Sequence, residues 1–174
     1  MLTQTKRWLY NRNLSQRLSS KSSNIKIDSF NPSQRIAILF DATDIKDKST
    51  VQHFADRLSH SDRQVKLLGY YHSKVEMSDS GFTFYNRKNL NWLGIPQNEM
   101  LDEFLQREFD ILIALIPKLT HHFEFIVKMA NAKLKIGPNF AEKDTYFDLI
   151  VDVQPSTIEN LIENIITTLD KVGH

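Results

Sequence analysis

The sequence predicts an α/β fold: a Rossmann-like three-layer sandwich whose central sheet has five to six mostly parallel strands. Three observations predict it. From Arg35 onward, short apolar runs alternate with segments of helical periodicity, as in β–α–β units. Four of the five clearest strand segments lack polar alternation, which is typical of strands that helices cover on both faces. The length of 174 residues suits one such domain with an appendage.

The predicted strands are short segments with the length and composition of buried strands. They comprise residues 35–42, 64–72, 109–117, 132–137 and 147–153. A sixth segment, residues 81–92, is less regular, and we expect it to be an edge strand that runs into a loop. The most apolar of all is FDILIALIP, at residues 109–117.

The predicted helices carry apolar residues at spacings of three and four, so that one face of each helix is apolar. They comprise residues 46–60, 98–109, about 120–131 and 156–172. The inward residues of 46–60 are Val51, Phe54, Ala55 and Leu58; those of 98–109 are Leu101, Phe104 and Leu105; and those of 156–172 are Ile158, Leu161, Ile162, Ile165, Ile166 and Leu169. Strands and helices in this order imply β–α–β crossovers, which place helices on both faces of the sheet.

The first 33 residues differ in composition from the rest of the chain. We therefore divide it into a basic N-terminal arm with its linker, residues 1–33, and a single α/β domain, residues 34–174. The arm has six basic side chains, and no acidic side chain occurs before Asp28. Residues 27–174 hold 16 basic and 21 acidic side chains, so a basic arm precedes a mildly acidic body.

Composition and motifs exclude several classes of protein. The sequence has no cysteine, which excludes disulfides, thiolate metal sites and cysteine nucleophiles. It contains neither G-x-G-x-x-G nor G-x-x-x-x-G-K-[ST], and no G-x-S-x-G elbow, so we expect no dinucleotide site, no cofactor and no hydrolase triad. It has no run of 18 apolar residues and no secretory h-region, so we expect a cytoplasmic protein without a membrane span.

Polar residues that follow the predicted strands are candidates for a ligand crevice, because ligands of open α/β sheets bind at the carboxyl ends of the strands. The candidates are Asp41, Asp44, His72, Lys118 and His121. This crevice would take a small molecule or a sugar phosphate, and it requires a concave site in which these side chains converge. We assign no catalytic residue.

Asp41 and Asp44, in the stretch RIAILFDATD, are close enough in sequence to form an acid/base pair. A phosphoaspartate enzyme of the haloacid-dehalogenase kind needs two aspartates separated by one residue, and here Thr43 occupies the second position. Aspartate also favours helix N-caps. We therefore expect Asp41 to terminate the strand and Asp44, or Asp47, to cap the next helix.

His121 and His122 resemble a metal-binding pair in composition but not in spacing. Neighbouring residues on a helix point about 100° apart, whereas metal chelation from one helix uses positions i and i+4. We therefore expect one of the two to face solvent and the other to lie at the helix start, with no metal bound.

The basic arm is the second candidate site. Trp8 and Tyr10 alternate with basic residues, which suits stacking on single-stranded RNA or docking on an anionic surface; the alternative is a terminus whose charges only aid solubility. The predicted contact residues are Lys6, Arg7, Trp8, Arg12 and Arg17. The preferred interpretation is a non-catalytic module that docks on a protein assembly or a ribonucleoprotein, and RNA is a candidate direct partner. The alternative is small-molecule or sugar-phosphate binding at the crevice.

Six segments of the domain carry a resemblance to a known family. They are AILFDATD (37–44), KLLGYY (66–71), NLNWLGIP (89–96), FDILIALIP (109–117), ANAKLKIGP (130–138) and YFDLIVDV (146–153). From about residue 35 to the C-terminus, the chain resembles a family of small bacterial α/β proteins of unknown function. This resemblance implies an α/β fold and no particular activity.

Residues 109–137 carry a second resemblance. A strand, a helix and an A-K-x-x-x-G turn (Ala132, Lys133, Gly137) follow one another as in the amino-terminal Rossmann half of heptosyltransferase-type glycosyltransferases. The sequence departs from that family because it has no glycine-rich acceptor loop after the first strand and no second domain for a nucleotide sugar. The resemblance implies, at most, a reduced glycosyltransferase-like enzyme whose donor site has been lost.

Overall fold

The computed structural model describes residues 34–59, 62–74, 81–140, 146–152 and 157–172, so the arm lies outside the described residues. The elements are β1 (Arg35–Asp41), α2 (Ile45–Ser59), β2 (Gln64–Tyr71), β3 (Thr83–Asn86), the 3-10 helix η1 (Arg87–Asn89), α3 (Glu99–Gln106), β4 (Glu108–Leu115), α4 (His121–Met129), β5 (Asn131–Pro138), β6 (Leu149–Val151) and α5 (Ile158–Val172). None of the described helices is long and apolar enough to cross a membrane.

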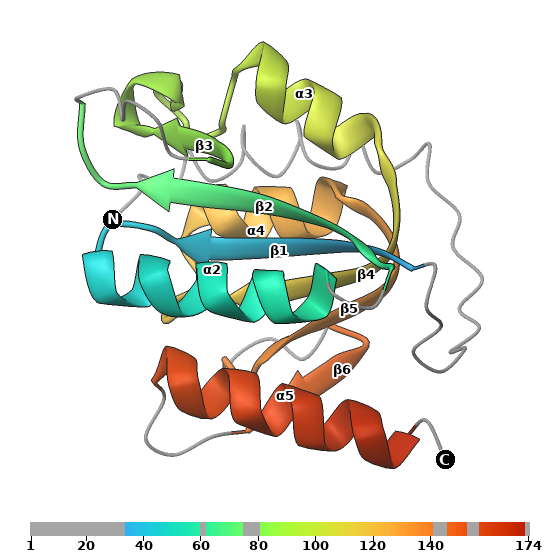
Figure 1. Ribbon diagram of the computed structural model, residues 1–174. Coiled ribbons are helices and arrows are strands. Elements are labelled where there is room, and N and C mark those ends of the chain that lie inside the picture. The colour runs from blue at the N-terminus through green and yellow to red at the C-terminus, as the bar shows by residue number, and fades with distance from the viewer. Residues whose placement is uncertain (1–33, 60–61, 75–80, 141–145, 153–156, 173–174) are drawn as a thin grey trace.

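The strands form one six-stranded sheet in the order β3-β2-β1-β4-β5-β6, in which every neighbouring pair is parallel (Figure 1). The predicted Rossmann-like α/β fold is therefore confirmed. The chain builds the sheet outward from β1 in one direction through β2 and β3, and then in the other direction through β4, β5 and β6. The junction of β1 and β4 is thus the point at which the strand order reverses, where doubly wound folds bind their ligands.

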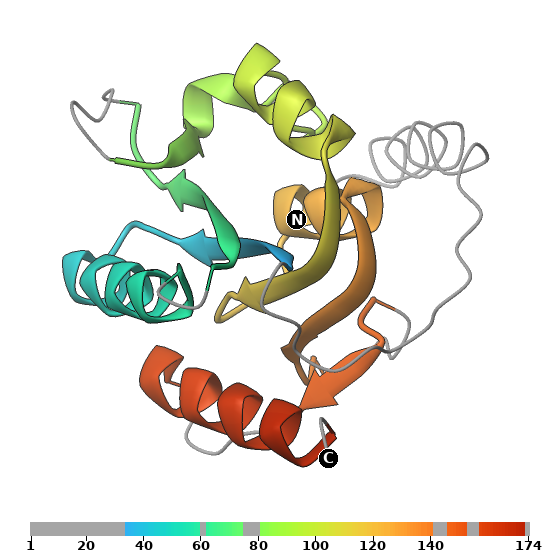
Figure 2. The same cartoon turned by 45° about the vertical axis from the view of Figure 1, so that its right-hand side comes forward.

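The helices lie on both faces of the sheet, as the predicted crossovers require. Figure 2 shows α2 and α5 on one face and α3 and α4 on the other. Ile36, Ile38 and Phe40 of β1 pack on the α2 and α5 side, whereas Ala37 and Leu39 pack on the α3 and α4 side. All five side chains are fully buried, which explains why the sequence of this strand is continuously apolar.

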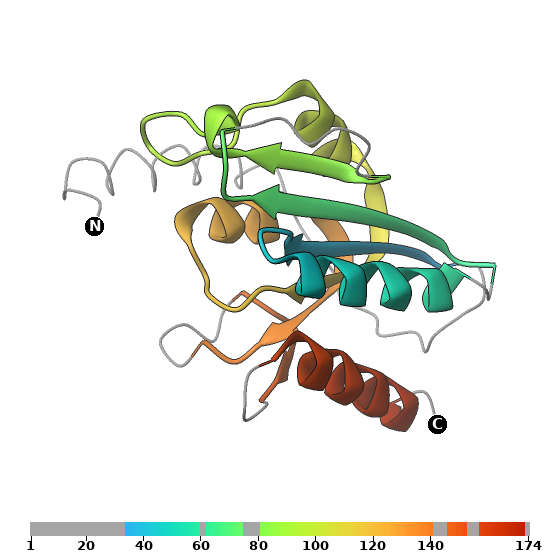
Figure 3. The same cartoon turned by 60° about the vertical axis from the view of Figure 1, so that its left-hand side comes forward.

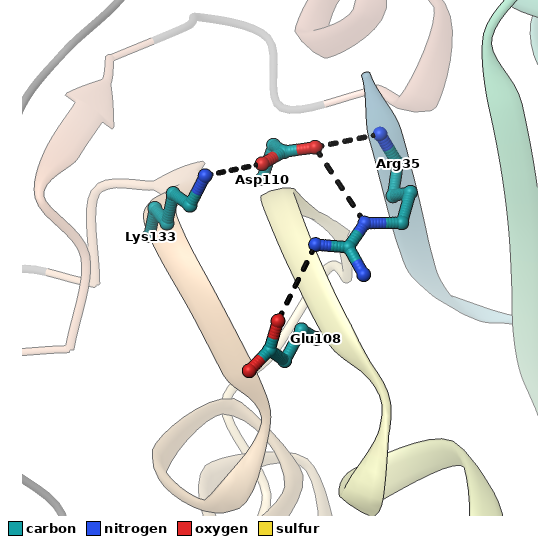
Figure 4. Close-up of polar contacts among 4 residues, drawn as sticks. All are labelled: Arg35, Glu108, Asp110 and Lys133. Atoms are coloured by element: carbon teal, nitrogen blue, oxygen red, sulfur yellow. Dashed lines mark hydrogen bonds and ion pairs between the residues drawn. The ribbon is translucent and has the colours of Figure 1, made fainter. Parts of the chain in front are cut away.

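Ion pairs join β1, β4 and β5 near the amino-terminal ends of these strands (Figure 4). Asp110 Oδ2 accepts the Arg35 N–H at 2.9 Å, and Asp110 Oδ1 accepts from Lys133 Nζ at 2.7 Å. The Arg35 guanidinium also reaches Glu108, with Nη2 3.5 Å from Oε2. Burial alone would raise the pKa of Asp110, but the bonds from Arg35 and Lys133 outweigh burial and hold that pKa below its usual value.

The ambiguous segment 81–92 begins with the edge strand β3, as predicted, and continues through η1 into a loop. At the other edge, β6 is shorter than the predicted strand of residues 147–153. Phe147 lies before β6 and packs against Gly137, where an added Cβ would lie 2.4 Å from the ring atom Cζ. This side chain packs in the core beside β5, and β6 begins two residues later, at Leu149.

Candidate functional site

A pocket of about 730 Å³ lies at the carboxyl-terminal edge of the sheet, and we call it the strand-end pocket. Figure 3 shows β1, β2 and β3 with their arrowheads toward this edge. The volume of the strand-end pocket falls in the range of small-molecule sites. The residues that line it are Asp41, Tyr70, His72, Arg87, Leu90, Asn91, Trp92, Leu93, Gly94, Pro117, Lys118, Thr120, His121, His122 and Phe123. They lie at or after the carboxyl ends of β1, β2, β3 and β4, so the pocket spans the point where the strand order reverses.

Four of the five predicted crevice residues line this pocket: Asp41, His72, Lys118 and His121. Asp44 does not, because it caps α2: its Oδ1 accepts the N–H groups of Lys46 at 2.7 Å and Asp47 at 3.3 Å. This is the structural role that the sequence indicated for it.

The turn after β1 holds Asp41 at the pocket. Asp41 ends the strand, and its Oδ1 accepts the Thr43 N–H at 3.0 Å. Thr43 Oγ1 in turn accepts the His72 N–H at 3.0 Å, which ties the end of β1 to the end of β2. One oxygen of the Asp41 carboxylate has no hydrogen bond from a described residue, so it can accept one from a ligand.

Tyr70 and His72 belong to the same wall of the pocket. Residues i and i+2 of a strand face the same side, and the Tyr70 hydroxyl is hydrogen-bonded to Nδ1 of His72 at 3.1 Å. Sequence reasoning selected His72 but missed Tyr70. The signal was the alternation itself, which turns Tyr71 away from His72 and Tyr70 toward it.

The two adjacent histidines begin α4 and have different environments. His121 is half exposed, with Nδ1 3.7 Å from Oε2 of Glu124. His122 is buried, and its Nδ1 is hydrogen-bonded to the Tyr85 hydroxyl at 2.8 Å. Burial, assisted by the nearby His72 and His121, lowers the pKa of His122 to about 4, so this imidazole is uncharged at neutral pH.

Metal binding has no support in the part of the chain that the structure describes, where no three His, Asp or Glu side chains are placed to hold an ion. The carboxylate of Glu124 is already occupied. Its Oε1 accepts from Lys128 Nζ at 3.0 Å and from the Tyr146 hydroxyl at 2.7 Å.

Arg87 and Lys118 supply positive charge to the pocket. Arg87 begins η1, whose fold is set by Asn86: its Oδ1 accepts the Lys88 N–H at 2.9 Å, and its own N–H donates to Asn89 at 2.9 Å. The side chains of Arg87 and Lys118 make no hydrogen bond or ion pair with any residue that the structure describes. Their charges are therefore available to an anion.

The first turn of α4 adds to this positive end. Helix N-termini leave N–H groups without intrahelical partners and carry partial positive charge. The N-cap Thr120 makes no side-chain capping bond, and its buried Oγ1 has no hydrogen-bond partner among the described residues. Thr120 and α4 therefore reinforce the anion preference that Arg87 and Lys118 establish.

Trp92 forms an aromatic wall of the pocket, on a turn that side-chain hydrogen bonds hold. Its side chain is 62% exposed, whereas its neighbours Leu93 and Ile95 are buried and anchor the loop. Asn91 Oδ1 accepts the N–H groups of Leu93 at 2.9 Å and Ile95 at 3.0 Å, and Gly94 has the positive φ of +77° that glycine tolerates best. The sequence predicted a loop after the edge strand here, and in the structure this loop lines the pocket.

The predicted arm contacts, Lys6, Arg7, Trp8, Arg12 and Arg17, lie outside the described residues.

Comparison with known proteins gives a family and no activity. No curated protein matches the chain. The model of DUF6913, described as a family of unknown function, matches residues 5–172, and so includes most of the arm as well as the domain. The chain therefore belongs to this family of unknown function.

Proposed function

We propose that the protein binds a phosphorylated small molecule, a sugar phosphate in class, in the strand-end pocket. One observation carries the proposal: Arg87 and Lys118, two cations whose side chains have no partner in the described structure, line the same pocket. A phosphate group carries about −1.5 to −2 charges near neutral pH. Charge-assisted bonds from arginine and lysine to such a group are the strong ones among hydrogen bonds.

The other lining residues suit the sugar. Trp92, whose side chain is 62% exposed, offers an aromatic surface against which the apolar side of a sugar ring can pack. The free oxygen of Asp41 can accept a hydrogen bond from a sugar hydroxyl. Asp41 also opposes the cations, but two cations and one carboxylate leave a net positive pocket, to which the start of α4 adds.

Calorimetric titration with ribose 5-phosphate, and with ribose as its uncharged partner, tests the proposal. We expect ribose 5-phosphate to bind and ribose to bind far more weakly. Lys118→Gln and Arg87→Gln should each weaken binding about tenfold or more, the loss of one charge-assisted hydrogen bond. Lys66→Gln is the matched control, because Lys66 is exposed on β2 outside the pocket. Equal binding of sugar and sugar phosphate, or equal loss in the control, would overturn the proposal.

We propose a second function for the arm, docking on a protein assembly or a ribonucleoprotein in the cytoplasm. Two observations support it: the arm has six basic and no acidic side chains before Asp28, and the family match begins at residue 5. The test is a pulldown with the full chain and with a chain that begins at Ser33, at low and high salt. RNA contact should weaken steeply with salt. Equal recovery with both chains would reject the arm as the contact.

The resemblance to heptosyltransferase-type glycosyltransferases concerns only half of a fold, and similarity of fold does not by itself imply a function. Ala132, Lys133 and Gly137 lie on β5, and Lys133 bonds to Asp110 at the edge opposite the pocket. We therefore propose no glycosyl transfer.

A further inference from the structure

Tyr85 and His122 form a buried pair behind the strand-end pocket. Tyr85 lies on β3 and is fully buried, and His122 lines the pocket. The Tyr85 hydroxyl lies 2.8 Å from Nδ1 of His122, and it has no other hydrogen-bond partner among the described residues. The position of the shared proton therefore decides what His122 presents to a ligand.

The geometry determines which atom donates. Burial raises the pKa of Tyr85 well above its usual value, so the phenol keeps its proton at neutral pH. If Nδ1–H donated to the phenol oxygen, the phenol hydrogen would be buried without an acceptor, which proteins strongly disfavour. The phenol therefore donates to Nδ1. A neutral imidazole with an accepting Nδ1 carries its hydrogen on Nε2.

The Nε2–H group of His122 is available to a ligand. No described residue hydrogen-bonds to Nε2. The ring is held in place by its neighbours, with its centroid 4.1 Å from that of Tyr70 and 4.3 Å from that of Phe123. His122 is thus a fixed donor without charge, deeper in the protein than the exposed Arg87 and Lys118.

We propose that His122 binds the sugar part of the ligand, with Nε2–H donating to an uncharged hydroxyl or ring oxygen while Arg87 and Lys118 hold the phosphate. This inference rests on the function proposed above. A phosphate dianion loses most of its hydration when it is buried beside an uncharged group, so it favours the exposed cations. Burying a hydroxyl or ring oxygen costs far less desolvation free energy, and one neutral donor can supply its hydrogen bond.

The tautomer is tested on the unaltered protein by long-range ¹H–¹⁵N correlation spectra of the histidine rings at pH 7. We expect His122 in the Nε2–H form. Adding ribose 5-phosphate should shift the His122 Nε2 and its proton, whereas adding inorganic phosphate should leave them in place. The Nδ1–H form, or an equal shift with both probes, would overturn the inference.

Binding constants for the same two probes provide the second test. The double variant Tyr85→Phe with His122→Phe removes both polar partners together, so that no unpaired polar atom is left in the core. We expect ribose 5-phosphate to bind about tenfold more weakly, the loss of one hydrogen bond, and inorganic phosphate to bind as before. His53→Phe, an exposed change on α2 outside the pocket, is the control.

The two probes separate the two proposals. If inorganic phosphate and ribose 5-phosphate both fail to bind the unaltered protein, the proposed function fails and this inference falls with it. If both bind but the double variant weakens both equally, or weakens neither, the phosphate site stands and the role of His122 is wrong.

Discussion

Lys133 Nζ lies 2.7 Å from Asp110 Oδ1, so β5 is joined to β4 by an ion pair at the edge of the sheet opposite the strand-end pocket. The other oxygen of Asp110 accepts the first backbone N–H of β1. One carboxylate thus connects three adjacent strands, and it does so far from any proposed ligand. Its role is stability, which separates it experimentally from the pocket residues.

Asp110→Asn should lower the free energy of unfolding by about 1–3 kcal/mol at pH 7, because the charged acceptor for Arg35 and Lys133 is lost. Because Lys133 is mostly exposed, we expect the lower half of that range. Glu103→Gln, an exposed change on α3, is the control and should change stability little. Denaturant unfolding of the three proteins measures the effect.

The same variant predicts a pH dependence. The pKa of Asp110 in the folded protein lies below 3.8, so the unfolded chain binds this proton more readily. The stabilisation is therefore present above about pH 4 and is lost as the pH falls through the folded pKa. The difference between the unaltered protein and Asp110→Asn should shrink from pH 7 to pH 3. A constant difference over this range would contradict the prediction.

His122 predicts a second and separate pH window. Its pKa is about 4 in the folded protein against 6.5 ordinarily, so the unfolded state takes up the proton first as the pH falls. The free energy of unfolding should therefore be highest above pH 6.5 and should decline by on the order of 3 kcal/mol toward pH 4. The double variant Tyr85→Phe with His122→Phe should lack this decline. Unfolding curves at half-unit pH intervals measure it, with the exposed His53→Gln as control.

Asn91→Ala should loosen the wall that carries Trp92. The variant removes the acceptor for the N–H groups of Leu93 and Ile95, which should lower local stability by about 1–3 kcal/mol. We expect faster hydrogen exchange at these two amides and weaker binding of ribose 5-phosphate. Gln97→Ala is the control because Gln97 is exposed and bonds through its backbone N–H. Unchanged exchange at Leu93 and Ile95 would show that Asn91 does not hold the turn.

Gly137→Ala should destabilise the protein by overpacking, at about 1–3 kcal/mol. The added Cβ would lie 2.4 Å from the Phe147 ring, closer than non-bonded carbon atoms approach one another. Adding Phe147→Leu should recover part of the loss, because the smaller side chain makes room for the methyl group. Thermal unfolding of the single and double variants compares the two, and an undiminished loss in the double variant would exclude this contact as the cause.

The elements of the fold were predictable from the sequence because each strand and helix has its own local pattern. The strand order was not, because pairing between β1 and β4 leaves no local mark. Asp41, His72 and Lys118 could be placed near a pocket because each follows a strand. Arg87 and Trp92 could not, since they reach the pocket only through the pairing of β3 with β2 at the edge of the sheet.

Burial of single side chains was equally out of reach of sequence reasoning. His121 and His122 are neighbours of the same type, and the spacing indicates only that they diverge. Which of them is buried depends on Tyr85, a residue on a strand that lies far away in sequence and packs against α4. Asp44 shows the opposite case, since capping is local and its role followed from its position before the helix.

The central position of β1 has a consequence for synthesis of the chain. β1 pairs with β2 and with β4, and the β4 register extends to Leu115. Its fully apolar residues therefore lack one neighbour until that segment has left the ribosome. Contacts so distant in sequence make folding slow, and an unpaired apolar strand invites association with other chains. The nascent chain therefore carries this apolar strand with one unpaired edge until β4 has been synthesised.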